Sequence, residues 1–347
     1  NSSTTALTGT TNIGFSTAPS PLPRRNQTGL TYVAWNNVPS GNYTINPSPP
    51  AAYTLQRSCW SSTSGASGEG PSTTLTGGRT LTYNLGYSVQ PAWMQVVGGS
   101  LNGGAASVSV TVPAGETLLK KEPGVTQNSP VVTYGTTLTT GSGTVSPDGY
   151  AVQDNAQSIP PGFSYYNYYT GVFGTKTNLG SGTLGADPVT GIYSAPGAGN
   201  LSVSGGGTFN VINGQNVVIF VPGNLTISKN ITVNEGGFLA FVVQGNITVS
   251  ATVGYASPIA NPDKVTQPNV SGIYISGGQF ITQGTPLAAD NQLIVAGTVV
   301  AGSFTLNRNL EGNNNAPGEM FIYRPDLWIF APAELKEIDV VWTEVAP

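Results

Sequence analysis

A ten-residue pattern that occurs twice restricts the fold of this chain more than any other feature of its sequence. Residues 218–227 read VIFVPGNLTI and recur as AFVVQGNITV at 240–249, which places Gly223 and Gly245 22 residues apart. Looser copies follow at Gly278, a further 33 residues along, and at Gly302, a further 24. Repeats of roughly this length, with short apolar strands separated by Gly and Asn, are typical of β-solenoids.

A solenoid makes definite predictions for the repeated positions. Asn224 and Asn246 should lie at equivalent corners, where Asn tolerates a left-handed backbone and can stack on its counterpart. Alternation along a strand should point Ile247 inward and Thr248 outward. The alternative is a β-sandwich with two similar hairpins, and we favour the solenoid. Its stacked coils would share one core row, formed by Leu225, Ile247, Phe280 and Phe304.

Composition favours an all-β chain with an uncharged surface. The chain has 46 Gly and 26 Pro, and only 8% of its residues are charged, whereas globular domains carry about 25%. There is no formal charge between Asp187 and Lys229. Such neutral polar surfaces suit proteins that pack against copies of themselves, because few charges must be desolvated on contact. Adaptation to an environment outside the cell is the simpler explanation, and both can hold.

The chain divides into four segments by composition. Residues 1–29 contain few apolar side chains and the sequence PSPLPRR at 19–25, which predicts a linker or an extended arm, or a strand lent to a neighbouring subunit. A β-sandwich is expected at 30–89, beginning with a hairpin at 32–45. Residues 90–160 form a second β region, either sandwich-like or the beginning of the solenoid. Residues 161–347 form the solenoid, whose open end would be capped by a short helix at 331–337.

The segment 30–89 resembles the Cna-B-like (prealbumin-like) β-sandwich modules of bacterial surface proteins. The matching motifs are NVPSGNYTI at 37–45, PAAYTL at 50–55 and LTYNLGY at 81–87. Many such modules carry a Lys–Asn isopeptide bond, but the first lysine of this chain is Lys120. The resemblance therefore implies the fold without the covalent cross-link.

The C-terminal half resembles the right-handed parallel β-helix modules of large secreted bacterial proteins, and more distantly the polymer-forming bactofilins. The closest likeness lies in MFIYRPDLW at 320–328 and VWTEVAP at 341–347. The resemblance implies an extracellular or cell-surface location and assembly, and it brings no catalytic residues.

The residues that most enzymes need are missing. The chain has no histidine, which removes the usual general base, the Ser-His-Asp arrangement and His metal sites together. A β-helix polysaccharide hydrolase or lyase remains the less favoured alternative. However, Asp187, Asp263 and Asp290 lie in separate loops and are expected to be turn residues that bind nearby backbone amides. We therefore predict no catalytic, cofactor-binding or metal-binding residue.

Three further features have ordinary explanations. Cys59 is the single cysteine, so no intrachain disulfide forms, and a small core residue or an ordinary thiol is expected. The aromatic run Tyr165–Tyr169 could stack on sugars, but packing within a strand or loop is the favoured interpretation. Chance explains the eight Asn-x-Ser/Thr motifs nearly as well as glycosylation does, and they lie at Asn1, Asn26, Asn42, Asn200, Asn224, Asn230, Asn246 and Asn269.

Charge and hydropathy restrict the partners. A net charge of −4 with scattered basic residues argues against nucleic acid, and no apolar run approaches the ~20 residues of a membrane span. The sequence thus predicts a non-enzymatic extracellular structural protein. It would be a subunit of a surface layer, filament or coat and would assemble with copies of itself. The alternative is an adhesin or glycan-binding surface protein.

Overall fold

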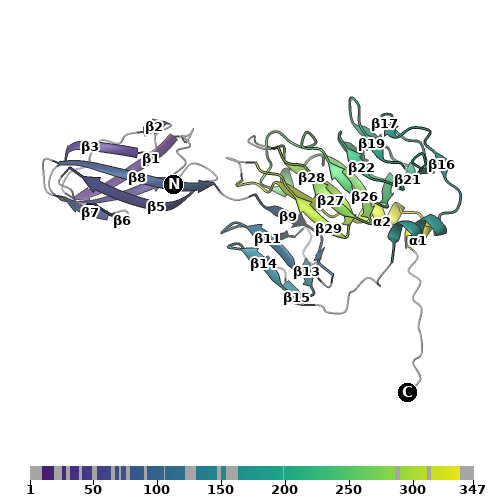
Figure 1. Cartoon of the computed structure of the whole chain (residues 1–347), viewed down its shortest axis with the longest axis horizontal. Coiled ribbons are helices and arrows are strands. Elements are labelled where there is room, and N and C mark those ends of the chain that lie inside the picture. The colour runs from purple at the N-terminus through teal and green to yellow at the C-terminus, as the bar shows by residue number, and fades with distance from the viewer. Residues whose placement is uncertain are drawn as a thin grey trace, which may run out of the picture. The chain divides into compact units, whose positions relative to one another are not determined.

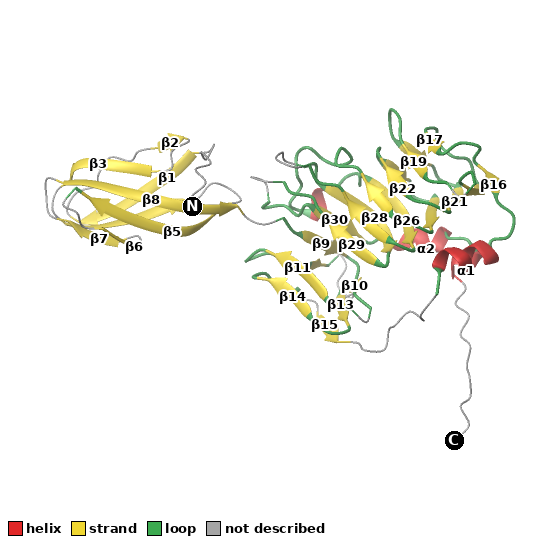
Figure 2. Cartoon of the chain, viewed as in Figure 1, coloured by secondary structure: helices red, strands yellow, loops and turns green. Residues whose placement is uncertain are grey.

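A computed structural model covers the whole chain (Figure 1). It describes the strands between residues 10 and 89, and residues 92–336 except 105, 122–129, 147–149, 154–162, 198, 286–289 and 311–313. The chain forms two compact units, Asn1–Gln90 with Glu311–Asn315, and Pro91–Leu310 with Ala316–Pro347. The described residues are mostly β-strand (Figure 2), as the composition predicts.

The first unit contains an antiparallel sheet that includes the presumed linker. Its strand order is β2-β1-β4-β7, and seven consecutive residues of β1 pair with β4. The segment 1–29, expected to be a linker or arm, therefore contributes two paired strands. The bounds are β1 Thr10–Ala18, β2 Asn26–Thr28, β4 Gly41–Ser48 and β7 Ser72–Leu75.

A second antiparallel sheet of this unit has the order β3-β8-β5-β6. The hairpin predicted at 32–45 is wrong, because β3 pairs with β8 whereas β4 belongs to the other sheet. Alternation identified both strands, but it carries no information about which partner each strand takes. The bounds are β3 Tyr32–Val38, β5 Tyr53–Ser62, β6 Ser67–Glu69 and β8 Arg79–Val89.

The second unit is built from stacked coils, each of which adds one strand to a long parallel sheet. The order of this large sheet is β12-β9-β30-β28-β26-β24-β21-β18-β16. Its bounds are β9 Met94–Val97, β12 Leu119–Lys120, β16 Thr177–Asn178, β18 Gly191–Ser194, β21 Asn216–Val221, β24 Phe238–Val243, β26 Val270–Ser276, β28 Leu293–Val300 and β30 Glu319–Ile322.

Two further faces complete the coils. The six-stranded sheet, in the order β17-β19-β22-β25-β27-β29, is parallel, and so is the β20–β23 pair. This arrangement is consistent with the predicted β-solenoid. The bounds are β17 Thr183–Leu184, β19 Leu201–Val203, β20 Phe209–Val211, β22 Leu225–Ile227, β23 Ile231–Val233, β25 Ile247–Val249, β27 Gln279–Thr282 and β29 Ser303–Leu306.

The coils do not follow one another in sequence order. Strand β9 pairs with β30, the last strand of the large sheet along the chain, and β12 lies outside β9. The described residues of the segment 90–160 therefore belong to the stacked coils rather than to a second sandwich. They also form the parallel sheets β10-β13-β15 and β11-β14. The bounds are β10 Leu101–Asn102, β11 Val108–Val112, β13 Val131–Tyr134, β14 Leu138–Gly141 and β15 Tyr150–Gln153.

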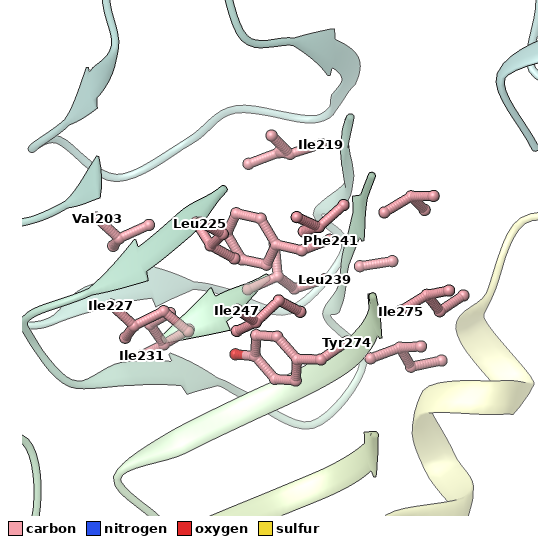
Figure 3. Packing of buried hydrophobic residues seen from close by; sticks show 14 of the residues in the cluster. Val203, Ile219, Leu225, Ile227, Ile231, Leu239, Phe241, Ile247, Tyr274 and Ile275 are labelled. Atoms are coloured by element: carbon pink, nitrogen blue, oxygen red, sulfur yellow. The ribbon is translucent and has the colours of Figure 1, made fainter. Parts of the chain in front are cut away.

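The solenoid interior is filled by apolar side chains from all faces (Figure 3). In the three-residue strands the outer two residues are buried and the middle one is partly exposed, as in Ile247-Thr248-Val249. The rings of Phe241 and Tyr274, on neighbouring strands, stack with centroids 5.8 Å apart. The Tyr274 hydroxyl, which is fully buried, donates to the backbone oxygen of Ser271 at 2.9 Å.

The repeated glycines occupy equivalent corners, as the sequence predicts. Gly245 donates to the backbone oxygen of Gly223 at 3.0 Å, Gly278 to that of Gly245 at 3.1 Å, and Gly302 to that of Gly278 at 2.8 Å. A Cβ at Gly245 would lie 2.3 Å from Asn224 Oδ1. Only glycine fits this close approach of successive coils.

The predicted stacking of corner asparagines is confirmed and extends further than expected. Asn224 N donates to Asn200 Oδ1, Asn246 N to Asn224 Oδ1, and Gln279 N to Asn246 Oδ1, each at 2.8 Å. Each side chain thus satisfies the corner amide of the next coil. The sequence pattern had identified Asn224 and Asn246 but not Asn200.

Helices lie on one side of the large sheet, which corrects two predictions. Tyr165–Tyr169 belongs to helix α1 rather than a strand or loop, and Ser164 Oγ caps it by accepting from Asn167 N at 3.2 Å. Helices α1 and α2 contact β24 and α3 contacts α1, so the predicted C-terminal cap covers a side of the sheet instead of its open end. The bounds are α1 Tyr165–Val172, α2 Pro325–Phe330, α3 Ala333–Lys336 and the 3-10 helix η1 Pro262–Lys264.

Candidate functional site

The six-stranded sheet lacks a strand at the level of β30. Strand β28 is followed by β29 and β9 by β10, each across a glycine corner. After β30, however, the chain forms α2 and α3 and no strand between residues 323 and 336. Because β30 lies between β28 and β9 in the large sheet, the position between β29 and β10 is unfilled among the described strands.

A groove of about 1390 Å³ lies at this unfilled position. Strand β29 lines one side, with Ser303, Phe304 and Leu306, and strands β10 and β11 line the other. Residues of β30 and β9, including Phe321 and Val96, also line it. The groove is therefore an opening into the side of the solenoid, between coils that remain joined through the large sheet.

Phe304 is exposed at this opening, contrary to the predicted core row. Leu225, Ile247, Phe280 and Phe304 are in register on successive strands. The first three are fully buried, whereas Phe304 is 43% exposed. Its ring lies 6.0 Å from that of Phe280. The row ends in solvent because none of the described strands lies beyond β29 in this sheet.

A buried carboxyl group lies in the groove wall. Glu319, on β30, is 2% exposed, and its Oε1 accepts from Thr282 Oγ1 at 2.6 Å and from Arg308 N at 3.0 Å. Desolvation raises the pKa of Glu319 to about 7, although both hydrogen bonds oppose the rise. Near neutral pH the Glu319 carboxyl group is therefore protonated in part of the molecules and ionised in the rest.

Arg308 and Asp290 hold the chain next to Glu319. The Arg308 guanidinium donates to the backbone oxygens of Ala251, Asn291 and Ser250, and desolvation lowers its pKa. Asp290 accepts from Thr285 N at 2.6 Å and from Asn309 N at 2.8 Å. These contacts join segments that are distant in sequence, so the role of Arg308 and Asp290 is structural. Nothing in the sequence pattern marked Glu319 or Arg308, since neither belongs to a motif.

The predicted turn aspartates do not form a common site. Asp187 accepts from Asn210 N at 2.8 Å, which, like the bonds of Asp290, agrees with the expected binding of backbone amides. Asp263 lies in η1, where its own amide donates to Asn261 Oδ1 at 3.1 Å. Among the described residues, no three His, Cys, Asp or Glu side chains are grouped as metal ligands would be.

The outward side of the six-stranded sheet is a row of uncharged side chains. Each strand contributes one partly or fully exposed residue, and the residues are in register from coil to coil. Neighbouring strands are about 4.8 Å apart, so the side chains of the row are regularly spaced. It consists of Thr183, Ser202, Thr226, Thr248, Ile281 and Thr305.

Other candidates from the sequence are involved in packing. Tyr166 of the aromatic run packs against Phe220 with ring centroids 6.2 Å apart, and burial raises the pKa of Tyr166 and Tyr169. Cys59 is partly buried on β5. Asn269 is 3% exposed and accepts from Ile294 N, so its Asn-x-Ser motif is not accessible in the folded chain.

These features define a β-rich protein of stacked parallel coils with a lateral groove. No protein-family model matches the chain, and no curated protein matches it. Among solved structures, one described as an ice binding protein from an Antarctic Biological Consortium is similar, with 13% sequence identity and a TM-score of 0.32. The match covers 66% of this chain and 86% of that one. In the described residues, no helix combines the length and apolar character needed to cross a membrane.

Proposed function

We propose that this chain is a non-enzymatic, extracellular structural protein that assembles with copies of itself into a layer, filament or coat. The uncharged row from Thr183 to Thr305 on the six-stranded sheet carries the proposal. Contact between two such faces desolvates hydroxyl groups, which can pair with one another, and no charges. With only 8% of its residues charged, the chain presents little electrostatic repulsion between copies.

The groove supports a non-enzymatic role. Glycoside hydrolysis ordinarily needs two carboxyl groups about 5 to 9.5 Å apart, and Glu319 is the single carboxylate among the described residues that line the groove. Its oxygen Oε1 is already occupied by Thr282 and Arg308 N. The absence of histidine from the whole sequence leaves no usual proton acceptor nearby.

The test of this function is the size of the purified protein in solution. At micromolar concentration, sedimentation and negative-stain imaging should show large regular particles. Lysine substitutions at Thr226 and Thr248, on the outward row, should reduce the particles to small species through like-charge repulsion. The control is Thr232→Lys, because Thr232 is similarly exposed but lies on β23, on another face. A wild-type chain that stays monomeric would contradict the proposal.

A second candidate function is glycan binding by an adhesin. Phe304 and Tyr323 line the groove and are 43% and 37% exposed, and aromatic rings beside hydroxyl and amide groups suit sugar binding. Immobilised cell-wall glycan should then deplete the protein from solution, and Phe304→Ala should abolish the depletion. Equal depletion of the variant would exclude this groove as the binding site.

For the first unit, we propose the finer fold that the sequence motifs suggest. Its two antiparallel four-stranded sheets would pack face to face as a Cna-B-like sandwich, and the parallel coils of the second unit would wind as a right-handed β-helix. An experimental structure of the full chain tests both. Sheets that do not face one another would exclude the sandwich, and left-handed coils would exclude the likeness to the secreted β-helix modules.

A further inference from the structure

We propose that the unfilled position between β29 and β10 receives an extended strand from a second copy of this chain, supplied by residues 338–340 and the residues that follow them. The proposal rests on the self-association proposed above and specifies how one copy holds the next. The groove would then be an acceptor for β-strand addition.

The backbone on both sides of the groove is available for pairing. Among the described strands, β29 pairs with β27 alone, and β10 pairs with β13 alone. Each strand therefore has one edge whose N–H and C=O groups lack a neighbouring strand. The edge of β29 belongs to a sheet that is otherwise regular through six strands. A sugar ring cannot satisfy a strand edge in this periodic way, which favours a peptide over a glycan.

The side chains that the groove accepts follow from the rows of the sheet. One inward row runs from Leu201 to Phe304 and the other from Val203 to Leu306, with Ser202 to Thr305 pointing outward between them. An inserted strand must therefore read apolar, polar, apolar. The first apolar side chain would cover Phe304, which is 43% exposed, and the second would cover Leu306.

The chain's own sequence contains such a segment just after α3. Ile338, Asp339 and Val340 follow the apolar, polar, apolar pattern, and Val341 and Trp342 add further apolar surface. Burial of these apolar side chains in the groove would stabilise the inserted strand. The pattern matches that of β22 and β25, Leu-Thr-Ile and Ile-Thr-Val.

Distance alone does not decide which copy supplies the strand. Helix α3 contacts α1, and α1 contacts β26, which is two strand intervals from β30, about 10 Å. Trp328 of α2 also lines the groove, and four extended residues after Lys336 span at most about 14 Å. A second copy is the donor in this proposal because the self-association proposed above needs a connection between copies, whereas insertion by the same copy would fill the groove and leave the protein monomeric.

The direct test is binding of a fluorescent peptide of residues 337–347 to the full chain. The acceptor carries Ile338→Asp and Val340→Asp, so that its own tail cannot fill grooves. Saturable binding in fluorescence anisotropy is expected. Adding Phe304→Lys, which places a charge in the groove, should weaken binding at least tenfold. Thr232→Lys, on β23 and outside both the groove and the outward row, is the control and should change binding less than twofold.

Failure of this proposal is distinct from failure of the proposed function. If wild type forms large particles and the Ile338→Asp, Val340→Asp variant forms them equally well, the strand is not the connection, although self-association stands. Absence of peptide binding, or equal binding to the Phe304→Lys acceptor, also overturns the proposal. Binding of a cell-wall oligosaccharide without peptide binding would overturn it in favour of the adhesin. A monomeric wild type contradicts the proposed function itself.

Discussion

Phe280 and Phe304 occupy the same register position on adjacent parallel strands, yet Phe280 is fully buried and Phe304 is 43% exposed. The difference is not one of residue type or direction, since both rings belong to the same inward row of the six-stranded sheet. It arises because Phe280 is covered by a strand on each side, whereas Phe304 has β27 on one side and the groove on the other. The exposed ring thus marks where the stack of coils is incomplete.

Aspartate substitutions at two neighbouring positions test the register of the coils. Ile247 is fully buried and Thr248 is partly exposed, so Ile247→Asp should destabilise the second unit far more than Thr248→Asp. An unpaired buried carboxylate costs several kcal/mol, comparable to the total stability of a domain, about 5 to 15 kcal/mol. Urea unfolding followed by circular dichroism measures both. A more damaging Thr248→Asp would show that the strand is shifted by one residue.

The hydrogen bonds that join each corner asparagine to the amide of the next coil (the Asn ladder) should contribute measurably to the free energy of unfolding. Asn224→Ala removes the oxygen that accepts from Asn246 N at 2.8 Å, and loss of such a bond costs about 1 kcal/mol. Asn224→Asp keeps an oxygen at that position and should recover at least half of the loss. The urea midpoints of the three proteins decide the matter, and equal midpoints for Ala and Asp would show that the corner amide does not depend on this acceptor.

Glu319 should make the stability of the second unit depend on pH around neutrality. Its pKa rises from 4.5 to about 7 on burial, so between these values the folded chain holds a proton that the unfolded chain has lost. The contribution of Glu319 to the free energy of unfolding is therefore most favourable below about pH 4.5, and it is lost as the pH rises from there through 7. A shift of this size corresponds to roughly 3 kcal/mol.

The matched measurement is urea unfolding at pH 5 and pH 8. Wild type should lose stability between the two, and Glu319→Gln should remove most of that difference, since the amide stays neutral. Glu235→Gln serves as the control because Glu235 is exposed. An unchanged pH dependence in Glu319→Gln would mean that other groups titrate in this range.

Local, repeated features of the fold could be predicted from the sequence, because each coil repeats the same short-range requirements. The Gly corners, the Asn ladder and the inward position of Ile247 all follow from residues 218–249. The helix at Tyr165–Val172 was missed because Tyr favours strands, although Ser164 is a suitable helix N-cap. The Ser164 cap was the usable signal.

Long-range pairing explains what the sequence could not provide. Nothing in residues 94–97 indicates that β9 lies beside β30, since parallel pairing leaves no local trace. The groove follows from that pairing, and so does the exposure of Phe304. Thr282 is the polar member of the inward row that runs from Val203 to Leu306. Its hydroxyl is buried because Glu319, 37 residues later, accepts from it at 2.6 Å.

Self-association should persist when salt is raised from about 0.05 to 0.5 M. Twelve Lys and Arg and sixteen Asp and Glu are the only charged side chains in 347 residues, and the outward row and Phe304 are uncharged. Exposed ion pairs contribute about 0 to 1 kcal/mol each and are the contacts that salt screens. Apolar burial and strand-edge hydrogen bonds do not weaken over this range.

Sedimentation at both salt concentrations measures this persistence. The Thr226→Lys, Thr248→Lys variant is the control, and higher salt should partly restore its self-association because salt screens the added charges. Dissociation of wild type at the higher concentration would instead indicate an electrostatic interface, for which Arg24 and Arg25, outside the described residues, would be the first positions to substitute.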